Sequence, residues 1–204
     1  GKDGVDGQTP YIGKNGNWWI GNEDTGVKAE STDFIYDNRG EGTILVAYVG
    51  NDYDVVIPEK TTRIDNGAFA DNKVINTVKI PQNVTSIGKS AFENCINLCT
   101  ISLPNNLFSI GDSAFAGCTQ LEGTSDKGFS ELLALPEGLI CLGDSAFADC
   151  GSLYSVYIPF SLVTSDGWGK STFEHCTFLH SITWGTATDA NKTGDIPSYT
   201  FYEC

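Results

Sequence analysis

The sequence has 204 residues, 40% of them hydrophobic and 11% aromatic, which is enough apolar material for a substantial buried core. Its formal net charge of −14 disfavours nucleic acid and anionic membrane surfaces as partners, because both are bound through clustered lysine and arginine. No apolar run approaches the roughly 18 residues of a membrane span, and no signal peptide is present. Because the sequence contains no methionine, we expect a processed fragment whose export signal or anchor lies upstream.

Residues 1–10 are expected to form a linker. Glycine occupies every third position from Gly1 to Gly7, as in collagen, but only three triplets occur and Pro10 stands where the next glycine would fall. A flexible linker is therefore favoured over a collagen-like helix.

Residues 11–52 are expected to form a β-rich module and a cap. Asn15-Gly16 between short apolar runs predicts a β-hairpin. The adjacent Trp18 and Trp19 offer either a stacking platform for a sugar or, as is more usual, one core ring and one exposed ring.

A second hairpin is predicted just before the next domain. The apolar runs 43–49 and 55–57 flank a turn signal at Gly50-Asn51-Asp52. We expect this hairpin to cover the first coil of the domain, whose strand edge and apolar side chains would otherwise be exposed.

From residue 53 to 204 the sequence repeats near-copies of one pattern, I-G-x-x-A-F-x-x-C-x-x-L-x-x-I-x-L-P. A phenylalanine is followed three residues later by cysteine or asparagine at Phe69/Asn72, Phe92/Cys95, Phe115/Cys118, Phe147/Cys150, Phe173/Cys176 and Phe201/Cys204. The first three phenylalanines are 23 residues apart, a period within the range of leucine-rich repeats. A unit of this length cannot bury its apolar face alone, so the copies are predicted to stack as a solenoid of about six coils.

Alternating apolar and polar residues predict short parallel strands with one inward and one outward face. Inward pairs are expected at Val78/Ile80, Ile101/Leu103, Leu133/Leu135, Val156/Ile158 and Ile182/Trp184. The outward residues between them are Lys79, Ser102, Ala134, Tyr157 and Thr183. After the next glycine, Asp112 and Asp144 are expected to cap a single helical turn that carries the phenylalanine inward. The predicted fold class is α/β, a strand-rich leucine-rich repeat solenoid with short helical turns and an N-terminal β-hairpin cap.

These residues closely resemble the BspA-like leucine-rich repeat proteins, a bacterial surface family built from the same unit, over about residues 53–204. The segment from Thr9 to Ala29 is similar to a module near the N-termini of surface lipoproteins from gut-dwelling anaerobes. The resemblance implies export, a lipid or wall anchor upstream, a place at the bacterial cell surface, and adhesion or protein binding. The sequence departs from the pattern in an insertion from Glu122 to Ser130 and in the loss of the I-G step between Leu162 and Thr172.

The seven cysteines are expected to be free thiols, most of them buried as small hydrophobic side chains. Four share one register, where stacked coils would hold them about 4.8 Å apart with parallel Cα–Cβ bonds, a poor geometry for disulfides. The odd count leaves at least one unpaired in a monomer. A zinc site is disfavoured because Cys95-x-x-x-Cys99 lacks a second ligand pair.

No cofactor, metal or catalytic site is expected, so the protein is predicted not to be an enzyme. His175 and His180 are the only histidines, and no motif for nucleophilic, zinc-dependent or phosphate-binding chemistry occurs. The Asp-Ser-Ala steps that begin at Asp112 and Asp144 resemble an O-glycosylation acceptor, although they are also the repeat consensus.

The outward ladder and its neighbouring loops are the predicted binding surface. The ladder changes from charged to aromatic along the chain, which favours a contact patch toward the C-terminal half. The candidate ligand-binding residues are Tyr154, Tyr157, Lys79 and Trp168. The expected partner is a protein on a host or neighbouring cell, bound by a monomer, and the alternatives are a glycan ligand or a purely structural role.

Overall fold

The computed structural model describes residues 11–12, 17–20, 23–28, 33–37, 42–123, 132–163, 167–185 and 199–204, with the backbone alone before residue 33. The chain forms two compact units, Gly1–Asp33 and Phe34–Cys204. The predicted linker at residues 1–10 and the side chains of Trp18 and Trp19 lie outside the described residues.

The first unit contains a three-stranded antiparallel sheet. Strand β1 (Tyr11–Ile12) pairs with β2 (Asn17–Ile20), which also pairs with β3 (Glu23–Lys28). The antiparallel pairing of β1 with β2 confirms the first predicted hairpin, whose turn residues lie outside the described part of the chain.

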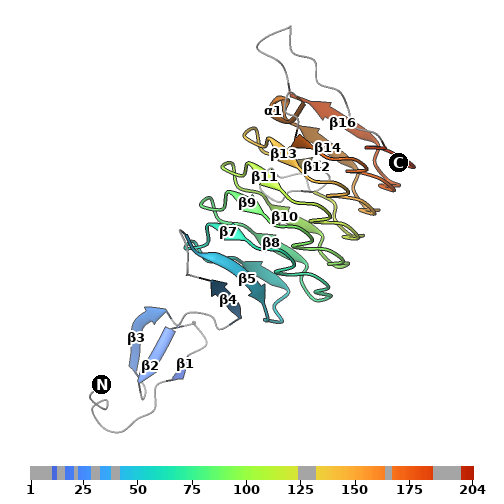
Figure 1. Ribbon diagram of the computed structural model, residues 1–204. Helices are drawn as coiled ribbons and strands as arrows, with labels where there is room; N and C mark the ends of the chain where they lie inside the picture. The colour runs from blue at the N-terminus through green and yellow to red at the C-terminus, as the bar shows by residue number, and fades with distance from the viewer. Residues whose placement is uncertain are drawn as a thin grey trace. The chain divides into compact units, whose positions relative to one another are not determined.

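The second unit is a solenoid in which each coil contributes one strand to each of two sheets (Figure 1). In the first sheet the parallel strands are β5 (Ile44–Tyr48), β7 (Arg63–Ile64), β9 (Ser86–Ile87), β11 (Ser109–Ile110), β13 (Cys141–Leu142) and β15 (Gly167–Trp168). The second sheet has two parts, β6 (Asp54–Val56), β8 (Thr77–Lys79) and β10 (Thr100–Ser102), then β12 (Leu132–Ala134), β14 (Ser155–Ile158) and β16 (Ser181–Trp184). The predicted fold class, a strand-rich leucine-rich repeat solenoid, is confirmed.

The cap of the solenoid is a hairpin, but not the one predicted. Strand β5 pairs antiparallel with β4 (Phe34–Asp37) on one side and parallel with β7 on the other, whereas β6 pairs with β8. The predicted pairing of 43–49 with 55–57 is therefore wrong, because these runs are the two strands of the first coil and lie in different sheets. Between them Tyr48 donates a hydrogen bond from its hydroxyl to Asp52 over 3.0 Å and fixes the corner. Strand β4 covers the edge that the coil would otherwise expose.

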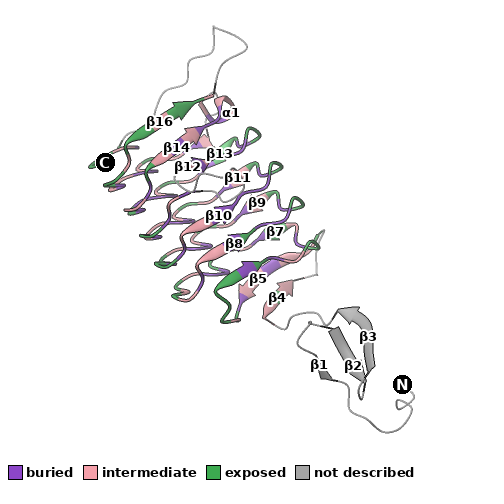
Figure 2. Cartoon of the chain, turned by 180° about the vertical axis from the view of Figure 1, so that it is seen from behind, coloured by how far each residue is buried: buried purple, intermediate pink, exposed green. Residues whose placement is uncertain are grey.

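A column of stacked aromatic rings runs through the core. The rings are Tyr48, Phe69, Phe92, Phe115, Phe147, Phe173 and Phe201, with neighbouring centroids between 4.6 and 5.6 Å apart. Phe92 and Phe115 are fully buried, as the repeat register predicts. Figure 2 shows buried residues inside the coils, exposed residues at their corners, and a largely exposed β16. Contact between rings of successive coils is one of the interactions that hold the stack together.

The turn that carries each phenylalanine is not helical, and the predicted caps are wrong. Ser113 has a backbone φ of 51° and Gly117 one of 72°, and these left-handed residues prevent a helix from propagating. Asp112 does not cap its own turn, since its carboxylate accepts the backbone N–H of Asp144 in the next coil at 3.1 Å. Asp144 accepts the N–H of Lys170 in the same way, at 2.7 Å. Among the described residues the one helix is α1 (Phe160–Val163).

The predicted inward and outward faces hold for most positions. The expected inward residues are buried except on β16, where Ile182 is half-buried and Trp184 is 39% exposed. Strand β16 is the last of its sheet, so no described strand covers its outer edge. Ser102, expected outside, is 2% exposed and lies where the sheet is interrupted between β10 and β12. Lys79 and Thr183 are exposed as predicted.

All seven cysteines are free, and four of them are buried in one column, at Cys95, Cys118, Cys150 and Cys176. Each of these thiols donates a hydrogen bond to the carbonyl oxygen of the phenylalanine in the preceding coil, over 3.1 to 3.3 Å. The prediction of free and mostly buried thiols is confirmed. The column therefore adds a polar link between coils inside a largely apolar core.

Candidate ligand-binding surfaces

Two of the four predicted site residues lie together on the surface. Tyr157 is an outward residue of β14, and Tyr154 immediately precedes that strand. Lys79 is exposed on β8, in the other part of the second sheet, between Val56 and Ser102 in the neighbouring strands. The structure thus separates Lys79 from the tyrosines.

The Tyr157 ring is held in place by its neighbours. Its hydroxyl donates a short hydrogen bond to the Glu137 carboxylate in the preceding coil. This carboxylate raises the pKa of Tyr157, since it stabilises the protonated phenol. On the other side, a Cβ at Gly185 would lie 2.9 Å from the Tyr157 hydroxyl, so glycine leaves room for the ring. Tyr157 is therefore a half-buried aromatic side chain with a fixed orientation.

Tyr154 forms an aromatic pair with the next coil. Its ring stacks on His180 with centroids 5.3 Å apart and an interplanar angle of 21°. The Tyr154 carbonyl accepts the backbone N–H of His180 at 2.8 Å, which holds the two residues in register. Tyr154 is 42% exposed, and its ring is held by the stacking contact with His180.

Trp168 is not a surface residue, and its assignment to the binding site is corrected. It pairs with Leu142 in the first sheet and is 8% exposed. The following Gly169 approaches the neighbouring coil so closely that a Cβ there would lie 2.3 Å from the carbonyl carbon of Gly143. Trp168-Gly169 therefore replaces the I-G step that the sequence interpretation regarded as lost, and the ring belongs to the core.

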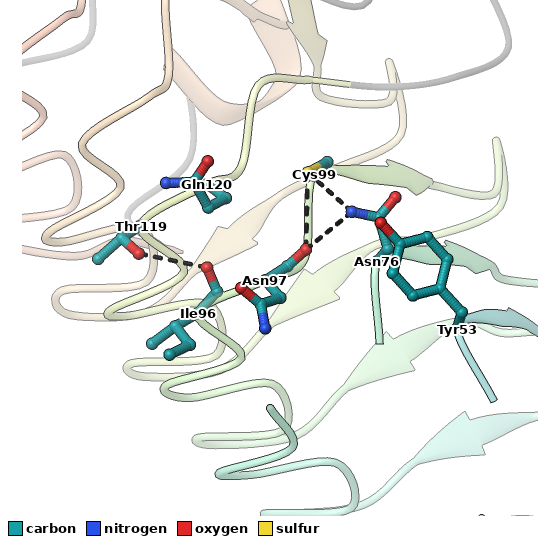
Figure 3. Close-up of a pocket in the computed structure, with 7 residues that line it drawn as sticks. All are labelled: Tyr53, Asn76, Ile96, Asn97, Cys99, Thr119 and Gln120. Carbon is teal, nitrogen blue, oxygen red and sulfur yellow. Dashed lines mark hydrogen bonds between the residues drawn. The ribbon is translucent and has the colours of Figure 1, made fainter. Parts of the chain in front are cut away.

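The repeats also form a groove that the sequence interpretation missed. It has a volume of about 480 Å³ and is lined by Tyr53, Asn76, Ile96, Asn97, Cys99, Thr119 and Gln120 (Figure 3). We call this the polar groove. Tyr53, Asn76 and Cys99 stand 23 residues apart, so they occupy the same repeat position in successive coils. Comparing equivalent positions across repeats, rather than motifs within one repeat, would have found it.

Hydrogen bonds fix two amides of the polar groove. The Asn76 Nδ2 donates to the Asn97 carbonyl oxygen at 3.1 Å and to the Cys99 sulfur at 2.9 Å (Figure 3). The Asn97 Nδ2 donates to the Lys73 carbonyl oxygen at 2.6 Å. Both amide nitrogens are therefore engaged, and both Oδ1 atoms have no hydrogen-bond partner within the described part of the chain.

The histidines take part in contacts between coils. His175 lies between two carboxylates, with Nδ1 3.2 Å from Asp149 and Nε2 3.3 Å from Glu203. In the described ranges no group of three or more histidine, cysteine, aspartate or glutamate side chains is placed to hold a metal ion.

Within the part of the chain that the structure describes, no helix has the length and apolarity needed to cross a membrane.

The stacked coils, the phenylalanine column and the strand ladder define a leucine-rich repeat solenoid. The family model for the BspA type leucine rich repeat region matches residues 48–128 and 125–204, in six copies. The chain therefore belongs to the BspA-type leucine-rich repeat family. None of the curated proteins matches it in sequence.

Solved structures share the fold. A leucine-rich repeat protein from T. pallidum is similar with a TM-score of 0.66 and 28% identity, over 76% of this chain and 70% of that one. A leucine-rich repeat protein from Bacteroides ovatus gives a TM-score of 0.51 and 27% identity, over 74% of this chain and 45% of that one. The pneumococcal vaccine antigen PcpA has the same fold with a TM-score of 0.59 and 21% identity, over 84% of this chain and 42% of that one. The chain spans less than half the length of these last two proteins.

Proposed function

We propose that this chain is a non-enzymatic binding module of a bacterial cell-surface protein, which attaches to a protein on a host or neighbouring cell. The observation that carries the proposal is the pair Tyr154 and Tyr157, two ordered and accessible rings at β14. Membership of the BspA-type family supports the surface location. An anchor upstream of the chain is part of the proposal.

Ordered tyrosines suit a binding role for an energetic reason. A tyrosine buries a large area on contact and loses little side-chain entropy, which is why the residue is frequent at binding hot spots. Here the contacts with Glu137 and His180 already restrict the two rings, so a partner would order them at little further cost.

The charge of the chain favours a partner with a basic surface. A net charge of −14 speeds encounter with positively charged proteins and slows encounter with acidic ones. Such steering acts over about a Debye length, so binding is expected to weaken as the salt concentration rises.

A binding screen tests this function. The chain is immobilised and probed by surface plasmon resonance with purified host matrix proteins and, separately, with an array of glycans. We expect binding to at least one protein, weakened in the Tyr154→Ala/Tyr157→Ala variant. Binding only to glycans, or protein binding that this variant leaves unchanged, would overturn the proposal.

A further inference from the structure

We propose that the polar groove is a binding site for a neutral saccharide, separate from the tyrosine surface at β14. The groove lies across four successive coils near the N-terminal end of the solenoid, whereas Tyr154 and Tyr157 belong to a later coil. It therefore adds a second kind of ligand to the proposed function and does not depend on it.

The charge of the groove points to the chemistry of its ligand. All of its seven lining side chains are uncharged, on a chain whose net charge is −14. An acidic saccharide would be repelled by the surrounding chain, and a cationic ligand would find no carboxylate in the lining. A neutral, hydroxyl-rich molecule is not repelled by the charge of the chain and needs no carboxylate in the lining.

The fixed amides supply acceptors for sugar hydroxyls. Because the Asn76 and Asn97 nitrogens are bound to backbone carbonyls or sulfur, their Oδ1 atoms keep one orientation. An acceptor that is already oriented costs little entropy when it binds a hydroxyl donor. Gln120 has no hydrogen-bond partner among the described residues, so its amide remains able both to donate and to accept.

Tyr53 supplies the apolar surface that a sugar ring also needs. Tyr53 is 60% exposed. Its ring lies at one side of the groove (Figure 3). The face of an aromatic ring is electronegative, so it attracts the weakly positive C–H groups on one face of a pyranose. Ile96 adds an exposed aliphatic contact in the same groove.

The size and rigidity of the groove fit a small part of a glycan. Its volume of about 480 Å³ lies within the range of roughly 300–1,000 Å³ that is typical of ligand pockets. The backbone under it is bonded from coil to coil, with the Asn76 N–H donating to the Tyr53 carbonyl and the Cys99 N–H to the Asn76 carbonyl, each over 2.8 Å. The backbone of the groove and the Asn76 and Asn97 amides are thus in place before a ligand arrives.

The test uses the whole chain and variants that leave the fold intact. An array of neutral oligosaccharides and their sialylated counterparts is first probed with the labelled chain. The neutral oligosaccharide that binds most strongly is then titrated into the chain by calorimetry. We expect neutral glycans to bind, and Tyr53→Ala to weaken them by about tenfold, as loss of one aromatic stacking contact does. Tyr53→Phe should keep most of the affinity, and Gln120→Ala should reduce it.

Two further measurements make the result decisive. The matched control is Phe178→Ala, which removes a 70% exposed aromatic ring outside the groove and should leave the affinity unchanged. Bound oligosaccharide should also slow alkylation of Cys99 by iodoacetamide, since this half-buried thiol lines the groove. The proposal fails if no neutral glycan binds, or if sialylated glycans bind with the same affinity as neutral ones. It also fails if Tyr53→Ala leaves the affinity unchanged, or if peptides from a library, and not oligosaccharides, slow the alkylation of Cys99.

Discussion

The Cys118 thiol donates a hydrogen bond to the carbonyl oxygen of Phe92 in the preceding coil, with a sulfur to oxygen distance of 3.1 Å. The same carbonyl also accepts the backbone N–H of Cys95 at 3.2 Å. The phenylalanine and cysteine columns are therefore joined by hydrogen bonds as well as by packing. This link explains why a thiol, and not only an aliphatic side chain, fits the repeat position.

The first prediction concerns the number of accessible thiols. In the native chain, Ellman's reagent should react quickly with the exposed Cys141 and Cys204, more slowly with half-buried Cys99, and hardly at all with the four buried thiols. In denaturant without reductant the count should reach the seven cysteines of the sequence. A count near one would mean three disulfides and would contradict the thiol column.

The second prediction is a loss of stability at alkaline pH. Burial raises the pKa of Cys95 from 9.0 to about 12, so the folded chain holds this proton more tightly than the unfolded chain does. The stabilisation is complete below pH 9 and should be lost as the pH rises toward 12, by about 1.4 kcal/mol per pH unit for each such thiol. Urea unfolding at pH 7 and pH 10.5 measures this loss.

The control for this pH dependence is the Cys95→Ala variant. It should be less stable at pH 7 but should lose less stability between the two pH values, since one buried titrating group is gone. Equal losses in the variant and the native chain would show that the thiol does not contribute.

The third prediction concerns the aromatic column. Phe92→Ala or Phe115→Ala should each lower the free energy of unfolding by about 3–5 kcal/mol, because each leaves a cavity between two stacked rings. Phe108→Ala is the matched control, since that ring is half-exposed on the surface. Thermal melts of the three variants and the native chain measure this loss. Unchanged melting temperatures in both core variants would refute the stacked solenoid.

The fourth prediction concerns the close approach of coils at the I-G step of the repeat pattern. A Cβ at Gly111 would lie 2.6 Å from the backbone nitrogen of Lys89, so Gly111→Ala must push two coils apart. We expect a loss of about 1–3 kcal/mol in unfolding free energy. Gly138→Ala, whose nearest atom would be 3.6 Å away, should have little effect. Similar melting temperatures for the two variants would argue against this packing.

The repeat register could be predicted from the sequence because the same pattern recurs in every coil. The first three phenylalanines of the pattern are 23 residues apart and meet in successive coils, so the sequence alone placed Phe92 and Phe115 in the core. The cap could not be placed in the same way. The turn signal at residues 50–52 suggested a hairpin, but pairing of β5 with β4 and β7 outweighs that local preference.

The candidate sites were less predictable because they depend on which side chains share a surface. Tryptophan is a residue type that is frequent in binding sites, yet the pairing of Trp168 with Leu142 places its ring in the core. The polar groove is made by variable positions of four coils, which no single motif contains. Ser102 was assigned outward by alternation alone, which takes no account of the interruption of its sheet.

The most direct test of the proposed binding role is the affinity of the Tyr157→Ala variant for the protein partner found in the binding screen. We expect a loss of at least about 1 kcal/mol, which is about fivefold in Kd, with a melting temperature close to that of the native chain. Phe108→Ala, which removes a 47% exposed ring next to β11 in the other sheet, serves as the control and should retain the native affinity. An unaltered Kd for Tyr157→Ala would contradict the proposal and place the contact surface elsewhere on the chain.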